Sequence, residues 1–144
     1  MRFETNKDLQ NELDAITLYC EVFNSSFEKL GENDIDYRVT KPNRIQHVEV
    51  KGRNRKIENA FPLPIAARKV VKLVDKKTEP IVIWNCFDGL IICDLSSVKS
   101  SGYISGRKPR EGSANDVEYM LYFEKQDNFY CIKKDSKKIF KLFK

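Results

Sequence analysis

Two carboxylates and a lysine occupy positions from which paired strands could bring them together. In the stretch 44–53, alternation places Glu49 and Lys51 on one face of a strand and valines on the other. The preceding run, 34–40, alternates as well and carries Asp36. A carboxylate and an ammonium group two residues apart on a rigid strand could hold a metal ion beside a catalytic cation.

A turn between these two strands determines how they pair. Residues 42–43 are Pro-Asn, and both residue types suit the central positions of a turn. A turn that is symmetric about them places Asp36 opposite Glu49 and Arg38 opposite His47. Directly opposed residues of an antiparallel pair have Cβ atoms about 4.5–5.5 Å apart. Two carboxylates at that separation repel each other unless a cation or a shared proton lies between them.

A single Mg²⁺ ion suits such a pair, because it binds one or two carboxylates and keeps several waters. The alternative is an exposed, salt-bridged hairpin in which Lys51 neutralises Asp34 and no metal binds. A one-residue bulge in either strand would also break the register.

From Asp36 to the Glu-Val-Lys of residues 49–51, the pattern resembles the D…ExK signature of the PD-(D/E)xK nuclease superfamily, which has the restriction-endonuclease-like fold. The order of elements is similar too: a helix with a glutamate, an acidic strand, the ExK strand, a basic amphipathic helix and a buried strand. Segment 106–118 is similar to small phage-encoded members. One departure is Ile35, which stands where the signature has proline.

This resemblance implies metal-dependent hydrolysis of phosphodiester bonds, with Mg²⁺ or Mn²⁺ as cofactor and nucleic acid, DNA as the first expectation, as substrate. The implied metal ligands are Asp36, Glu49 and the carbonyl of Val50, and Lys51 would orient the water and stabilise the transition state. A glutamate of the first helix and a lysine of the second often join such sites. The candidates for catalysis are therefore Asp36, Glu49, Lys51, Lys69 and Glu12.

Basic residues crowd the proposed hairpin and its exit, where seven lie between positions 38 and 56. Such residues bind phosphates, which gives affinity without reading sequence. We expect nucleic-acid contacts from Arg53, Arg55, Arg107 and Arg110, with the long stretch 96–115 as a flap over the substrate. The alternative is a set of solvated loops.

The charge is unevenly distributed along the chain. Residues 1–36 carry a net charge of −6 and the remainder carries +11, which gives the total of +5. This asymmetry favours a polyanionic partner bound on one side.

The length of 144 residues suits one domain. We predict a single nuclease-like domain with a core over about 5–95 and a C-terminal loop and hairpin over 96–144. The expected fold class is α/β, a restriction-endonuclease-like core of order α-β-β-β-α-β-β with a mixed central sheet flanked by helices, plus a C-terminal β-hairpin. Four scattered cysteines and one histidine argue against zinc and predict buried thiols.

Hydrophobic periodicity predicts the individual elements. The first helix follows Thr5, with an apolar stripe that starts at Leu9 and Leu13. The second helix covers about 65–76, with Val74 facing inward. The expected strands are 27–30, 80–87, 90–95, 117–123 and 129–133. Of these, 80–87 should be buried on both faces and turn at Asp88-Gly89, and the last two should form a hairpin.

Without a membrane-spanning run or a signal peptide pattern, a cytoplasmic protein is expected, in the host cytoplasm if it is phage-encoded. Cleavage of both strands would suit a homodimer. The tail 137–144 should dock Ile139, Leu142 and Phe143 on the domain, and it faintly resembles peptides that bind bacterial sliding clamps. Two other functions stay open. One is a catalytically lapsed nuclease fold that binds nucleic acid or a host replication or defence protein, and the other is an antagonist of host defence that acts through protein contacts.

Overall fold

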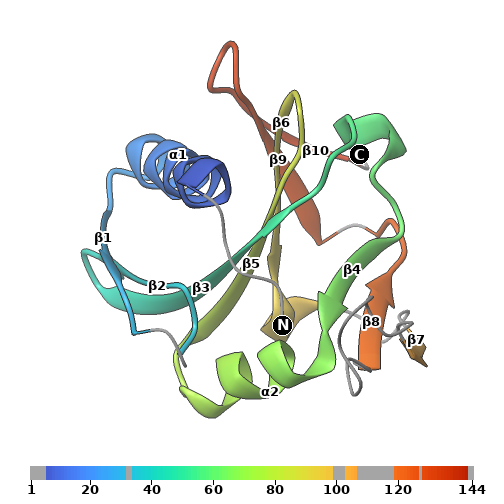
Figure 1. Ribbon diagram of the computed structural model, residues 1–144. Coiled ribbons are helices and arrows are strands. Elements are labelled where there is room, and N and C mark those ends of the chain that lie inside the picture. Colours follow the sequence, from blue (N-terminus) through green and yellow to red (C-terminus); the bar gives the residue numbers. More distant parts are fainter. Residues whose placement is uncertain (1–5, 32–33, 99–102, 107–118, 127, 143–144) are drawn as a thin grey trace.

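The computed structural model describes residues 6–31, 34–98, 103–106, 119–126 and 128–142 as a mixed α/β fold with two α-helices and two sheets (Figure 1). In chain order the elements are α1 (Asn6–Val22), β1 (Ser26–Lys29), β2 (Tyr37–Lys41), β3 (Arg44–Gly52), η1 (Ile57–Asn59), β4 (Leu63–Ala66), α2 (Ala67–Asp75), β5 (Glu79–Asn85), β6 (Gly89–Asp94), η2 (Leu95–Ser97), β7 (Tyr103–Gly106), β8 (Tyr119–Phe123), β9 (Phe129–Lys133) and β10 (Ile139–Lys141). Neither described α-helix has the length and apolar character needed to cross a membrane.

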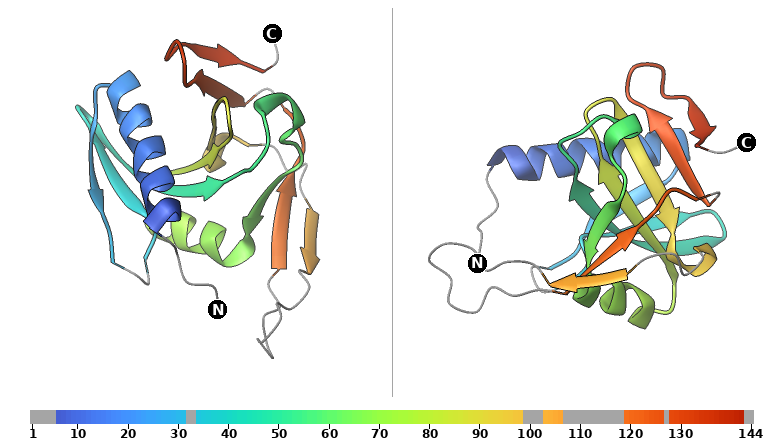
Figure 2. Two further views of the ribbon diagram at one scale, coloured as in Figure 1. Left: turned by 45° about the horizontal axis from the view of Figure 1, so that its top comes forward. Right: turned by 90° about the vertical axis from the view of Figure 1, so that its right-hand side faces the viewer.

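The large sheet has seven strands in the order β1-β2-β3-β5-β6-β9-β10. β3 and β5 are parallel, and the other neighbouring pairs are antiparallel. A smaller sheet has the order β4-β8-β7. In Figure 2, α1 lies along one face of the large sheet, and the small sheet and α2 lie on its other side.

Two apolar layers hold these parts together. On the α1 side, Ile16 and Tyr19 pack in one cluster with Val48 and Val50 of β3. On the opposite side, Trp84 of β5 packs with residues of the small sheet and of α2. β5 is therefore buried on both faces, as predicted, and so is β6, for which no such prediction was made. The four cysteines are free and buried, which confirms the expectation of structural thiols.

Both helices differ from the prediction in detail. The buried residues of α1 begin at Ala15, whereas Leu9 and Leu13 are exposed. Residues 63–66 form β4, because they pair with β8, and α2 therefore begins later than expected. Val74, predicted to face inward, is 59% exposed, and Leu73 is the buried residue of this helix.

The expected hairpin of 117–123 with 129–133 is wrong. β8 pairs with β4 and β7, while β9 pairs with β6 and β10. The physical reason lies in the residues of β9: Phe129 and Cys131 pack on one side of the sheet and Ile132 on the other, which suits a central strand. Beyond it, Phe140 and Leu142 pack on the core as the tail docks, but Ile139 is 49% exposed. Phe143 lies outside the described residues.

The turn between β5 and β6 also lies elsewhere than predicted. Asn85 pairs with Leu90, so the turn is centred on Phe87 and Asp88 rather than on Asp88-Gly89. Phe87, expected in a buried strand, is 63% exposed. Gly89 belongs to β6, where an added Cβ would overlap the carbonyl oxygen of Ile132 in β9. The glycine therefore permits a close approach of two strands.

Gly89→Ala should lower the free energy of unfolding by about 1–3 kcal/mol, because its Cβ would collide with the β9 backbone and lie 2.9 Å from Ile57 Cδ1. Urea denaturation measures this loss. Gly31→Ala is the matched control, since a Cβ there meets nothing within 4 Å and should change stability by no more than about 0.5 kcal/mol. Equal stability of the two variants would contradict the close packing of β6 on β9.

Candidate active site

The β2–β3 hairpin has the register that the Pro-Asn turn predicts. Arg38 pairs with His47, and the ladder continues to Tyr37 opposite Val48. Asp36 directly precedes β2, so the same register puts it opposite Glu49. The Asp36 carboxylate accepts a hydrogen bond from the backbone N–H of Val50 (2.9 Å), which holds it against β3. The two carboxylates that the sequence pairs are therefore neighbours in the fold.

Glu49 is the most unusual polar residue of this region. It is only 3% exposed, and its Oε1 atom has no hydrogen-bond partner within the described part of the chain. Its Oε2 atom lies 3.7 Å from Nζ of Lys69 in α2, which is an ion pair but a long one. A buried acceptor without a donor costs about 1–3 kcal/mol. Such a cost points to a role other than stability.

The electrostatics agree with this geometry. Burial, followed by the neighbouring Glu49 and Glu12 carboxylates, raises the pKa of Asp36 to about 7. The N–H of Val50 and the ammonium group of Lys29 act in the opposite direction. Asp36 therefore gains or loses its proton near neutral pH.

Two lysines partly compensate the second carboxylate. Burial raises the pKa of Glu49, and the positive charges of Lys69 and Lys51 oppose that rise. Lys69 is 15% exposed on its side chain, and Lys51 is partly buried two residues after Glu49. Both lysines singled out from the sequence thus lie close enough to act on this carboxylate.

Glu12 belongs to α1, which covers the face of the sheet that carries Val48 and Val50. Its carboxylate pairs with Nζ of Lys29 in β1 (2.9 Å) and raises the pKa of both Asp36 and Glu49. Sequence reasoning missed Lys29. The available signal was its place in a strand that pairs with β2, where it lies opposite Tyr37.

Two further polar residues near the carboxylates have other partners. Asp34 pairs with Lys76 at the end of α2 (2.7 Å), and this contact lowers the pKa of Asp34. The alternative in which Lys51 neutralises Asp34 is therefore wrong. His47 Nδ1 hydrogen-bonds with the hydroxyl of Thr78 (2.6 Å).

The predicted phosphate-binding arginines divide into three groups. Arg53 donates to the carbonyls of Ala60 (2.9 Å) and Pro62 (3.2 Å), so it holds the loop after β3. Arg55 is exposed and available to a ligand. Arg107 and Arg110, with most of the expected flap, lie outside the described residues.

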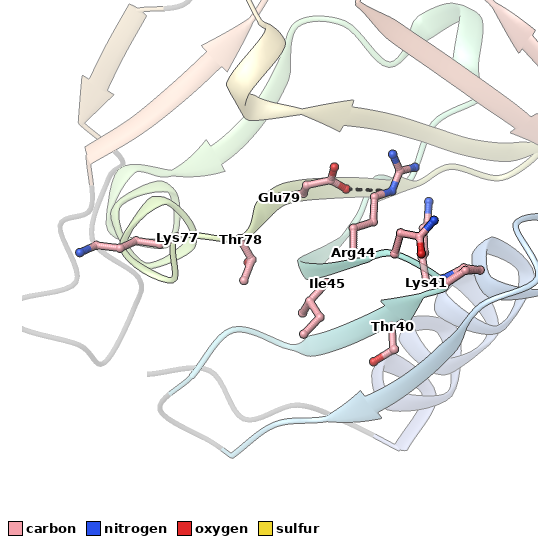
Figure 3. A pocket seen from close by; sticks show the side chains of 9 residues that line it. Thr40, Lys41, Arg44, Ile45, Lys77, Thr78 and Glu79 are labelled. Carbon is pink, nitrogen blue, oxygen red and sulfur yellow. Dashed lines mark ion pairs between the residues drawn. The ribbon is translucent and has the colours of Figure 1, made fainter.

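A cavity of about 700 Å³ opens elsewhere, between the β2–β3 turn and the start of β5 (Figure 3). Within it Arg44 is neutralised by Glu79 (3.3 Å), and Figure 3 shows the side chain of Lys77 directed away from Thr78 and Ile45. Its lining includes neither of the paired carboxylates. We therefore place the candidate active site at the carboxylates and not in this cavity.

The donor set suits a divalent cation only in part. Within the described ranges no three His, Cys, Asp or Glu side chains form a group that could hold a metal ion by themselves. Mg²⁺, however, uses one or two carboxylates and keeps several waters. The orphaned oxygen of Glu49 and the raised pKa of Asp36 both fit a cation that binds between them.

Without metal, the protein should lose stability as the pH rises from about 4 to about 7. The pKa of Asp36 is about 7 in the folded protein and near 3.8 in the unfolded chain, so the folded state holds this proton more tightly. The resulting contribution to the free energy of unfolding is complete below pH 3.8 and is lost as the pH rises through about 7. The slope reaches at most about 1.4 kcal/mol per pH unit. Urea denaturation in the presence of a chelator measures it.

Asp36→Asn should flatten that slope and exceed the parent in stability above pH 7, because the amide does not titrate and its oxygen can still accept from Val50. Glu21→Gln is the control, since it removes an exposed carboxylate that pairs with Lys137 far from the site. Parallel curves for the Asp36→Asn variant and the parent would refute the raised pKa.

Comparison with known proteins identifies the family of the chain. A family model described as "phage putative PDDEXK endonuclease" matches residues 1–130. No curated protein and no solved structure matches the chain. The matched segment contains Glu12, Asp36, Glu49, Lys51 and Lys69 and ends within β9. The chain therefore belongs to the phage PD-(D/E)xK nuclease-like family.

Proposed function

We propose that this protein hydrolyses phosphodiester bonds of nucleic acid, with DNA as the first candidate substrate, and that it uses Mg²⁺ or Mn²⁺ at the Asp36–Glu49 pair. The observation that carries the proposal is the orphaned Oε1 atom of Glu49, buried beside a second carboxylate whose pKa is raised to about 7. A fold that keeps two such groups together pays in stability for a function. The name of the matched family, which describes an endonuclease, supports the same reaction.

The cation would be held by Asp36, Glu49 and the carbonyl of Val50. The Val50 N–H is directed at Asp36, and the N–H and C=O of one strand residue point to the same side. When bound, a divalent cation supplies a more acidic water and offsets negative charge on the phosphate. Both carboxyls must be ionised in that state, which the raised pKa of Asp36 otherwise opposes near neutral pH.

The lysines supply the rest of the chemistry. Lys51 follows Glu49 on the same face of β3, so its ammonium group can orient the attacking water and stabilise charge that develops on the phosphate. Lys69 pairs with Oε2 of Glu49, so Oε1 of the same carboxylate would be the oxygen that binds the cation. Lys29 restrains Glu12 at the border of the site.

Glu49→Gln should abolish Mg²⁺-dependent cleavage, with a loss of roughly 100-fold or more, and should also reduce the rise in melting temperature that Mg²⁺ causes. Without metal it should be as stable as the parent or more stable, since one of two facing carboxylates is gone. Labelled single-stranded and duplex DNA and RNA, incubated with Mg²⁺ or chelator, report cleavage. Differential scanning fluorimetry reports the stabilisation.

Lys51→Ala separates the two roles. It should lose cleavage to a similar degree yet keep the stabilisation by Mg²⁺, because the carboxylates are intact. Glu21→Gln should retain both properties. Cleavage that continues in chelator, or at the parental rate in Glu49→Gln, would sink the proposal.

A further inference from the structure

An exposed phenylalanine marks the turn at one end of the large sheet. Phe87 is the exposed phenylalanine of the described residues, at 63%, and it sits at the tip of the turn between β5 and β6. The ring belongs to neither hydrophobic core cluster of the described residues, whereas Cys86 and Gly89 of the same turn are buried. Large apolar groups kept at the surface often serve binding.

Hydrogen bonds from three segments hold the turn rigidly. The N–H of Cys86 donates to the carbonyl of Gly89 (2.9 Å), which closes the turn. The carboxylate of Asp88 accepts from the N–H of Ile57 (2.9 Å), next to η1. Lys134 lies just after β9, and its Nζ donates to the carbonyl of Cys86 (2.7 Å). The backbone N–H of Lys134 donates to the carbonyl of Asp88 (3.1 Å). The ring is thus presented by a fixed backbone.

The turn adjoins the candidate active site. Gly52, at the end of β3, pairs with Asn85, which stands three residues beyond the partner of Glu49, on the order of 10 Å along the strand. The side chain of Asn85 also donates to the carbonyl of Asn11 (3.0 Å), the residue before Glu12. A strand bound at the carboxylates could therefore reach the ring within a few nucleotides.

Basic residues lie next to the turn that carries the ring. The N–H of Phe87 donates to the carbonyl of Arg55 (3.0 Å), so these two residues lie side by side, and Arg55 is exposed. Lys56 is exposed next to it, and Lys134 approaches from the β9–β10 turn. Figure 1 shows the β5–β6 turn, the segment with η1 and the β9–β10 turn gathered at the top of the molecule.

Acids lie in the same region as well. Asp88 uses one carboxylate oxygen to accept from the Ile57 N–H, Glu58 is exposed in η1, and the charge of Asp14 in α1 acts on Lys134. These acids match Arg55, Lys56 and Lys134 in number, so the region has no excess of cations. Its distinguishing feature is the exposed ring of Phe87 beside the exposed Arg55.

We propose that Phe87 and Arg55 form a platform on which an unpaired base of the substrate strand stacks while Arg55 binds a phosphate, so that the preferred substrate is a nucleic acid with single-stranded character near the cut. The choice of substrate class rests on the proposed function, whereas binding at the platform does not. Aromatic rings bind single strands because every base has a face to stack, and a paired base in a duplex offers no such face.

The test compares a labelled oligothymidylate with an abasic strand of equal length, which carries the same phosphates without bases. Fluorescence anisotropy in chelator measures both affinities. The parent should bind the oligothymidylate more tightly than the abasic strand, and Phe87→Ala should weaken only the former, by about tenfold. Phe87→Tyr should retain parental affinity, since a tyrosine ring also stacks.

Salt dependence separates the two residues. Phe87→Ala should leave the slope of log affinity against log salt unchanged, because no phosphate contact is lost. Arg55→Ala should flatten that slope by about 0.7 on a single strand. Ile139→Ala, which removes an exposed apolar side chain from the tail strand β10, is the matched control and should change neither quantity.

A Phe87→Ala variant that folds and binds both strands like the parent would overturn the proposal, as would equal affinity of the parent for the two probes. Circular dichroism and thermal melting check the fold, and the parent's relative affinity for the two probes keeps the test valid if the alanine variant unfolds. Because all binding is measured without metal, a protein that stacks bases but never cleaves would refute the proposed function alone. A protein that cleaves single strands and duplex equally, with no effect of Phe87→Ala, would refute the platform alone.

Discussion

Burying Glu49 beside Asp36 is the constraint that the rest of the site depends on. Each carboxylate loses hydration, and each raises the cost of ionising the other. The compensation is incomplete. Val50 supplies one N–H to Asp36, and Lys69 makes one long ion pair with Glu49. Lys51 and Lys29 act only through their charge, Lys51 on Glu49 and Lys29 on Asp36. A site that was built for stability would close these gaps with further donors. Here one carboxylate oxygen, Oε1 of Glu49, has no hydrogen-bond partner among the described residues.

The hairpin and its pair of carboxylates could be predicted from sequence because only local rules were needed. A Pro-Asn turn sets the register, and a period of two sets the faces, so that Asp36 and Glu49 follow without knowledge of the remaining chain. The burial of the Glu49 side chain could not be predicted from these local rules. It depends on α2, which brings Lys69 over β3 from twenty residues further along the chain. The same limit applies to Lys29, whose role appears only when β1 is placed beside β2.

The errors further along the chain share a cause. Asp88-Gly89 looks like a hairpin turn by composition, but Gly89 is glycine because β9 passes close to its backbone, and the register then makes Phe87 a turn residue. Likewise β8 and β9 are adjacent in sequence and belong to different sheets. In each case a contact between distant segments overrides a local signal. A residue that breaks a local expectation in this manner is a reason to look for a function, and the exposed ring of Phe87 was chosen for the proposed platform on that ground.

A buried polar network at the other end of β3 fixes the register that brings the two carboxylates together. Gln46 is buried on the α1 side, where it accepts from the hydroxyl of Tyr19 (2.6 Å) and donates to Glu79 (2.8 Å). Nζ of Lys41 lies 4.4 Å from the ring centroid of Phe23 and bonds to the same hydroxyl. Because side chains alternate along a strand, a slip of one residue would carry Gln46 away from Tyr19 and turn Glu49 into the apolar layer beneath α1. These satisfied groups therefore fix the register of β3, so Glu49 stays opposite Asp36 although the two carboxylates repel each other.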